Sequence, residues 1–225
     1  MNHKEYEIIR CGDGSDTLKI KDSEISFHSS HGAIQESQHI FIDAGLKHFK
    51  EKNPGLKKIK IFEVGFGTGL NALLAAMQAP KIKTTIEYHA IDLHPLPDDL
   101  FFKLNYAEIL NEFELYKTIT QTPWNQLVFI TPFFKLKKVE ADLTAYASNE
   151  KFDIIYFDAF APDDQPELWT EDIFKKIFDV LNSRGILVTY CSKSIVQKAL
   201  TAVGFTIEKI QGPRGKREIL RATRS

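Results

Sequence analysis

The chain has 225 residues, of which 43% are hydrophobic, and its formal net charge is −1. This length and composition are typical of a globular protein with one sizeable core. The nearly neutral charge excludes a strongly basic nucleic-acid coat, although a local basic patch can still bind nucleic acid. No apolar run reaches the roughly eighteen residues that cross a bilayer, and the first residues lack the apolar core of a signal peptide. We therefore expect a cytoplasmic protein.

Short β-rich apolar runs alternate with longer helical patterns from Leu56 onward, which indicates an α/β fold with a parallel sheet covered by helices. The expected strands are 58–64, 84–93, 152–158, 185–192, 204–210 and 217–223, and the last two are expected to pair antiparallel. Residues 127–143 predict two strands around Pro132, as a hairpin inserted at the sheet edge. The expected helices are 70–77, 98–115, 167–181 and 194–203.

On this pattern the chain divides into two parts. Residues 1–55 are predicted to form a small β-rich extension, and residues 56–225 the main α/β domain. Neither the two cysteines nor the irregularly spaced histidines of the extension form a metal-ligand pattern, so we expect no metal.

The stretch FEVGFGTGLN places Gly65, Gly67 and Gly69 between a strand and a helix. Glycines there let the backbone turn tightly and present N–H groups to a ligand. The spacing differs from that of dinucleotide-binding loops, and Glu63 adds a negative charge that would repel a pyrophosphate. The loop therefore favours a nucleotide-like ligand that carries a positive charge.

Three acidic residues are expected at the carboxyl ends of strands, where parallel α/β sheets bind ligands. Asp92 is placed to accept hydrogen bonds from a ribose diol, and together with Glu63 and the glycines it fits S-adenosylmethionine. Asp142 is a candidate for the adenine amino group, or alternatively a helix cap. Asp158 can orient or deprotonate a nucleophile, or cap the following turn.

Four motifs carry a family resemblance: GFGTGLN at 65–71, DAFAP at 158–162, GFTIEKIQGPRGKRE near the end and GAIQESQHIF in the extension. With these motifs the chain resembles the methyltransferases of the MnmC type, which make 5-methylaminomethyl-2-thiouridine in tRNA. The resemblance implies a Rossmann-like methyltransferase fold, S-adenosylmethionine as cofactor, and the 5-aminomethyl group of the wobble uridine as methyl acceptor. It also places Thr68 and Asn71 in the cofactor-binding loop.

The resemblance has limits. Many members carry an additional flavin-dependent oxidoreductase domain, and because this chain ends at Ser225 we expect that activity to be absent or supplied by a separate enzyme. The family often has Glu where Asp92 stands and Gly where Ala159 stands. The first difference keeps the ribose-binding chemistry at a shorter reach, and the second concerns the geometry of the loop.

The acceptor defines the expected chemistry. An alkylammonium, with a pKa near ~10, must lose a proton before its nitrogen can attack a methyl group. We expect Asp158 to accept a hydrogen bond from this amine and to align it. Phe160 and Pro162 are expected near the uracil ring, although Phe160 could instead belong to the core. Local cations would bind the tRNA phosphates. The candidates are Arg214, Lys216 and Arg217, and the lysines of KLKK at 135–138.

Two other functions remain open at this point. One is a small-molecule methyltransferase or aminopropyltransferase of the same fold, which the absence of a basic face around the site would favour. The other is a noncatalytic nucleotide-binding partner that retains the glycine loop. The sequence does not indicate the oligomeric state.

Overall fold

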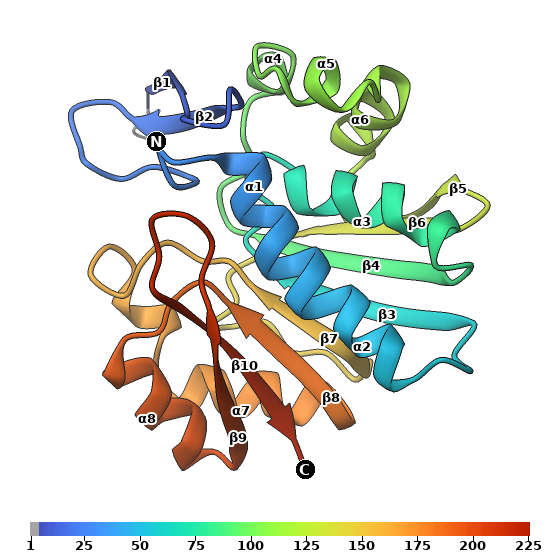
Figure 1. Ribbon diagram of the computed structural model, residues 1–225, viewed down its shortest axis with the longest axis vertical. Coiled ribbons are helices and arrows are strands. Elements are labelled where there is room, and N and C mark those ends of the chain that lie inside the picture. Colours follow the sequence, from blue (N-terminus) through green and yellow to red (C-terminus); the bar gives the residue numbers. More distant parts are fainter. Residues whose placement is uncertain (1–4) are drawn as a thin grey trace.

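The computed structural model describes residues 5–225, and its centre is a large sheet. The strands of this sheet are β3 (Lys58–Val64), β4 (Thr85–Asp92), β5 (Leu127–Thr131), β6 (Phe134–Glu140), β7 (Phe152–Phe157), β8 (Leu181–Thr189), β9 (Phe205–Gln211) and β10 (Glu218–Arg224). They lie in the order β5-β6-β4-β3-β7-β8-β10-β9 (Figure 1). The five strands from β6 to β8 are mutually parallel, whereas β5, β10 and β9 join through antiparallel pairings. The predicted α/β fold with a mostly parallel sheet is confirmed.

The central strand β3 is apolar on both faces because helices or loops cover both sides of it. Ile59 and Ile61 belong to one apolar cluster, and Phe62 and Val64 belong to the other. Helix α3 (Leu70–Lys81) packs in the first cluster, and α7 (Glu171–Val180) and α8 (Ser194–Ala202) pack in the second. The sheet is therefore the middle layer of three.

The extension departs from its prediction over its second half. Strands β1 (Tyr6–Arg10) and β2 (Asp16–Ile20) form the expected β-structure as a two-stranded antiparallel sheet. Residues 33–52, however, are helical: α1 (Ala33–Ser37), the π-helical η1 (Gln38–Lys47) and α2 (His48–Lys52) follow one another as a single helix across the sheet (Figure 1). The apolar residues of this helix recur at helical spacing, and Phe41 packs against Tyr156 of β7 with 5.0 Å between ring centroids. A β-rich extension is thus correct only for its first half.

The single helix predicted at 98–115 is also wrong, because the structure has three short helices there. They are α4 (Asp98–Phe101), α5 (Tyr106–Leu110) and α6 (Phe113–Gln121). Asn105 separates α4 from α5, because its side chain accepts a hydrogen bond from the Asp16 N–H and donates one to the Gly14 carbonyl. Asn111 ends α5 in a left-handed conformation (φ 53°). Tertiary contacts therefore override the apolar pattern of this segment.

The predicted hairpin at the sheet edge is confirmed by the antiparallel pairing of β5 with β6. From β6 the chain returns to the sheet centre through residues 141–151, which contain no helix. This crossover lies on the second face of the sheet, where Tyr146 stacks on Phe62 of β3 with 6.2 Å between ring centroids.

The order of the strands positions the site. From β3 the chain moves outward to β4 and β6, and from β7 it moves outward in the opposite direction to β8. Beyond β7, the short 3-10 helix η2 (Pro166–Leu168) leads into α7. The carboxyl ends of β3 and β7 therefore flank the point at which the strand order reverses, where open α/β sheets bind ligands. None of the helices within residues 5–225 is long and apolar enough to span a membrane.

Candidate active site

The glycine loop turns the chain from β3 into α3 and lies directly against the end of β7. Gly65 has φ +89°, and a Cβ added there would lie 2.7 Å from the Asp158 carbonyl oxygen. Gly69, just before α3, has φ +72°, and a Cβ added there would lie 3.0 Å from the ring of Phe66. Only glycine combines this backbone conformation with so close an approach. The predicted loop thus meets Asp158 at the switch point.

Asn71 joins the two central strands through its side-chain amide. Its Nδ2 donates to Glu63 Oε1 at 2.9 Å and to Asp158 Oδ2 at 2.8 Å. Glu63 and Asn71 are buried, and Asp158 is half-buried. The amide holds two carboxyl groups on one side of the glycine loop without contributing a charge of its own.

Glu63 presents an unpartnered oxygen inside the site. Burial raises its pKa well above the usual value, and the hydrogen bond from Asn71 opposes that effect. Among the described residues its Oε2 finds no hydrogen-bond partner, and the same holds for the buried Thr68 hydroxyl. Buried polar atoms without partners are unusual in a folded protein, so both atoms mark the glycine loop as a candidate ligand site.

Asp92 closes β4 beside the same loop. Its Oδ2 accepts from the Gly67 N–H at 3.0 Å, and its Oδ1 accepts from the His94 N–H at 2.9 Å. A carboxylate oxygen can accept more than one hydrogen bond, so Asp92 retains capacity for a hydroxyl donor. Asp142 lies nearby, because the preceding Ala141 N–H donates to the Asp92 carbonyl. The Asp142 carboxylate accepts from the Thr144 N–H at 2.8 Å within a turn, and because no helix follows it, the alternative of a helix cap is wrong.

Asp158 is a second carboxyl group in this region with a raised pKa. Burial is the main cause that raises its pKa to about 7, and the negative charge of Glu36 adds to it. The hydrogen bond from Asn71 and the positive charge of Lys216 act in the opposite direction. A carboxyl group whose pKa lies near neutrality can exchange a proton under physiological conditions.

The loop after Asp158 is held in place by apolar contacts. Phe160 packs edge-on against Phe27 of the extension, with 5.1 Å between ring centroids, and its carbonyl accepts from the Trp169 indole. Pro162 is buried. Phe27 was not predicted to approach the site, and a Cβ at Gly67 would contact its ring at 3.3 Å. The extension therefore forms one wall beside the glycine loop.

The loop between β9 and β10 carries the predicted cations in two different settings. Arg214 and Arg217 are exposed. Lys216 instead points inward, with its Nζ 3.4 Å from Glu36 Oε1 and 4.8 Å from the centroid of the Tyr190 ring. Sequence reasoning missed Glu36 and Tyr190, although Glu36 lies within the motif GAIQESQHIF.

The lysines of KLKK are not equivalent either. Lys138 is 1% exposed, and its Nζ donates to the Thr120 carbonyl at 2.7 Å and lies near the ring of Trp124. Burial lowers its pKa to about 8. The prediction that the lysines of this segment contact tRNA phosphates is therefore wrong for Lys138.

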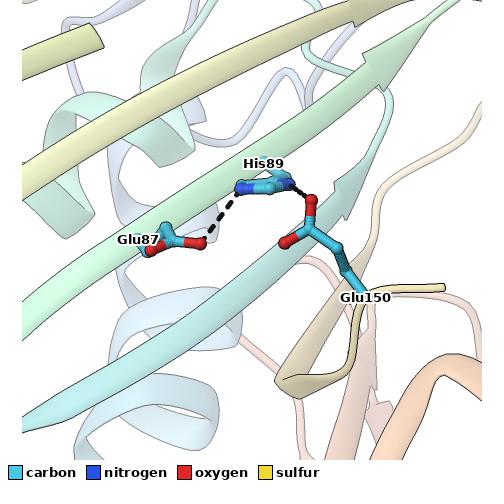
Figure 2. A group of neighbouring side chains, drawn as sticks. All are labelled: Glu87, His89 and Glu150. Atoms are coloured by element: carbon cyan, nitrogen blue, oxygen red, sulfur yellow. Dashed lines mark ion pairs between the residues drawn. The ribbon is translucent and has the colours of Figure 1, made fainter. Parts of the chain in front are cut away.

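Figure 2 shows a second group of ionisable side chains, formed by Glu87 and His89 of β4 with Glu150 of the crossover. Their ligand atoms lie within 4.8 Å of one another, as a metal would require. Lys58 and Lys60 contact Glu87 at 2.6 and 2.9 Å, and Lys60 also contacts Glu150 at 2.5 Å. Burial alone would raise the pKa of Glu87, but hydrogen bonds from both lysines outweigh it and lower the pKa to about 2. Because ammonium groups already hold these carboxylates, we treat the group as a salt-bridge network and assign no metal to it.

Comparison with known proteins shows which class of enzyme the chain resembles. A family model described as S-adenosyl-L-methionine-dependent methyltransferase matches residues 124–225. The spermidine synthase of Thermotoga maritima, at 14% identity, covers 100% of this chain and is itself covered to 71%, with a TM-score of 0.60, so it shows the same fold. The chain thus resembles S-adenosylmethionine-dependent methyltransferases over its second part, residues 124–225, as the sequence predicts.

More specific relatives confirm the resemblance to the MnmC type. The crystal structure of MNMC2 from Aquifex aeolicus is 27% identical, with a TM-score of 0.80, over 100% of this chain and 71% of that one. The tRNA 5-methylaminomethyl-2-thiouridine biosynthesis bifunctional protein MnmC of Burkholderia thailandensis is 29% identical over 86% of this chain and 31% of its own length. The protein of the same name from Actinobacillus pleuropneumoniae serotype 5b is 25% identical over 98% of this chain and 35% of its own length. The chain thus spans about a third of the length of these curated relatives.

Proposed function

We propose that the protein transfers a methyl group to the amino nitrogen of the 5-aminomethyl group on the wobble (2-thio)uridine of tRNA, giving 5-methylaminomethyl-2-thiouridine. The names of the MnmC relatives support this acceptor. The observation that carries the proposal is the Asp158 carboxyl group, whose pKa is raised to about 7 at the point where the strand order reverses. An amine acceptor needs a proton acceptor of this kind, whereas a phosphate-binding site would not place acids here.

The residues at the glycine loop fit S-adenosylmethionine. The tight turn at Gly65, Gly67 and Gly69 would allow the backbone to approach a ligand closely. The unpartnered Glu63 oxygen would accept a hydrogen bond from a cationic group of that ligand. Asp92, which accepts from the Gly67 N–H, would bind the ribose diol, and Thr68, Asn71 and Asp142 would complete the cofactor site. When bound, the cofactor supplies a methyl group whose bond to sulfur breaks as the bond to nitrogen forms.

In this proposal Asp158 prepares the acceptor nitrogen. The acceptor enters as an alkylammonium with a pKa near ~10. Once ionised, Asp158 accepts a hydrogen bond from it and then its proton, which leaves the lone pair on nitrogen free to react. Asn71 fixes the carboxyl group at 2.8 Å, so the orientation is set before the acceptor arrives.

The loop residues around Asp158 are proposed to bind the nucleoside and its phosphates. Phe160 and Pro162 lie next to Asp158 in the chain and would border the uracil ring. The exposed guanidinium groups of Arg214 and Arg217 are suited to bind phosphate. The aminomethyl group must be formed on the tRNA before it is methylated, so an enzyme that acts earlier on the same nucleoside supplies the substrate.

The test is methyl transfer from labelled S-adenosylmethionine to tRNA from cells that lack this gene, followed by nucleoside analysis. Asp158→Asn is measured in parallel, and Asp164→Asn, an exposed acid of the same loop, is the matched control. We expect label in 5-methylaminomethyl uridine, a loss of about 10²- to 10³-fold in Asp158→Asn, and little change in the control. Cofactor binding without any labelling of tRNA would contradict the proposal and favour a small-molecule amine as acceptor.

A further inference from the structure

Glu36 is a buried acid that none of the roles above explains. It lies on α1 and is 7% exposed. Its Oε2 accepts from the Ser29 N–H at 2.8 Å, and its Oε1 lies 3.4 Å from the Lys216 ammonium. A carboxylate is costly to bury unless it is paired, so its position beside the site needs a cationic partner.

The partner in this structure is a primary ammonium at the end of a methylene chain. The Lys216 Nζ lies against both Glu36 and the face of the Tyr190 ring, at 4.8 Å from its centroid. Tyr190 is fixed by its hydroxyl, which donates to the Ala159 carbonyl at 2.8 Å, one residue from Asp158. A carboxylate and an aromatic face together form a typical binding site for an alkylammonium group.

We propose that Glu36 and the Tyr190 ring, together with Asp158, form the binding site for the alkylammonium group of the methyl acceptor, and that Lys216 holds this site until the acceptor enters. This inference rests on the proposed function, because an aminomethyl acceptor has the same charged group as Lys216. The three residues come from α1, the end of β8 and the end of β7, so the site forms only when the extension packs against the sheet.

The two carboxyl groups of the proposed site have different roles: Asp158 takes up the proton, and Glu36 faces the positive charge. The N–H bond of the acceptor breaks and its electron pair stays on nitrogen, while the proton forms an O–H bond on Asp158. The Glu36 carboxylate is held in place by the Ser29 N–H. It offsets the positive charge of the acceptor before transfer and of the methylated ammonium after it.

The pH dependence of the site is set by every charged or ionisable group that faces Asp158. These groups are Glu36, Glu63, Lys216, Tyr88 and Tyr190. Removing the charge of Glu36 leaves Lys216 unopposed, which lowers the pKa of Asp158. The acidic limb of the pH–rate profile should therefore move to lower pH in Glu36→Gln.

The first experiment compares Glu36→Gln with Glu51→Gln, which removes an exposed charge from α2 at the far end of the same helix. With tRNA that carries the aminomethyl nucleoside, we expect kcat/KM of Glu36→Gln to fall by roughly 10- to 100-fold, mainly through KM, with cofactor affinity unchanged. Glu36→Asp should recover part of the activity, and Glu51→Gln should match the unchanged protein. Equal kcat/KM and equal pH profiles in Glu36→Gln and the unchanged protein would overturn the inference.

A second experiment needs no tRNA and so separates this inference from the proposed function. The Lys216→Met variant lacks the internal ammonium group of the site. n-Propylammonium chloride is titrated into this variant while NMR follows the signals of labelled tyrosine rings. Sodium chloride at equal ionic strength is the control. Saturable binding at Tyr190, weakened at least about tenfold by adding Glu36→Gln, supports the site. Absence of specific binding in Lys216→Met overturns it, whether or not the protein methylates tRNA.

Discussion

Buried carboxyl groups occur in two regions of this sheet, and their electrostatic settings are opposite. At the switch point, Asp158 is held by a neutral amide and faces another acid, and its pKa is raised to about 7. In the network of β4 and the crossover, two lysines bind Glu87 and its pKa is lowered to about 2. The second arrangement keeps a charge fixed and stabilises the fold. The first keeps a carboxyl group ready to take up a proton, which is what an amine methyltransferase requires.

The two settings also affect stability in opposite pH ranges. Asp158 has a folded pKa above its ordinary value of 3.8, so the folded state binds more protons and loses stability as pH rises from about 4 to 7. Glu87 has a folded pKa below its ordinary value of 4.5, so its contribution is present above that pH and is lost as pH falls toward about 2. The comparison therefore leads to separate predictions for each region.

The largest effect is expected from Gly65→Ala, which disrupts the contact between the glycine loop and Asp158. The added methyl group would overlap the Asp158 carbonyl oxygen, and the left-handed backbone is unfavourable for alanine. We expect a loss of about 2–4 kcal/mol in the free energy of unfolding together with loss of cofactor binding. Gly55→Ala is the control, because a Cβ there meets nothing within 4 Å. Denaturant titration that finds the two variants equally stable would contradict this prediction.

The next effect concerns Asn71→Leu, which removes the amide between Glu63 and Asp158 while keeping a similar volume. Without this donor the pKa of Asp158 should rise further, because the hydrogen bond from Asn71 lowers it. We expect kcat to fall by about 10- to 100-fold and the acidic limb of the pH–rate profile to move to higher pH. Gln78→Leu on the same helix serves as control, and an unshifted profile in Asn71→Leu would argue against the bridging role.

A smaller effect on stability alone is expected from Glu87→Gln. The variant should lose about 1–3 kcal/mol of unfolding free energy at pH 7 and much less at pH 2, where Glu87 is partly protonated in the unchanged protein. Methyl transfer at pH 7 should stay within about twofold, since Glu87 lies in the amino-terminal half of β4, away from the carboxyl ends of the strands. Thermal unfolding at both pH values measures the first part, and an activity loss comparable to that of Asn71→Leu would remove the distinction between the regions.

The smallest effect is expected from Arg214→Ala with Arg217→Ala. Because both side chains are exposed, their loss should raise the KM for tRNA by only a few-fold and make it less sensitive to salt. Lys81→Ala, an exposed cation at the far end of α3, should change neither quantity. Binding measured at two salt concentrations tests this, and an unchanged salt dependence would place the tRNA elsewhere.

The sequence predicted the parts of the site that depend on local pattern. Glycines between a strand and a helix, and acids at strand ends, follow from the order of residues along the chain, and the structure brings Gly65, Asp92 and Asp158 to one edge of the sheet. Glu36 and Tyr190 could not be found in this way, because their approach to Asp158 depends on how a helix packs across the sheet. The helix at 33–52 was missed although its apolar residues recur at helical spacing, so this part of the fold was open to prediction from the sequence.

The most direct measurement is the pH dependence of kcat/KM for methyl transfer to the aminomethyl nucleoside in tRNA. It compares the unchanged protein with Asp158→Asn from about pH 5.5 to about pH 9, in steps of about half a pH unit. The raised pKa predicts a rate that increases as pH passes through about 7 and then levels, because Asp158 must be ionised to accept the proton. Asp158→Asn should lack this increase and be slower throughout. A variant with the rate and profile of the unchanged protein would contradict the central role of Asp158.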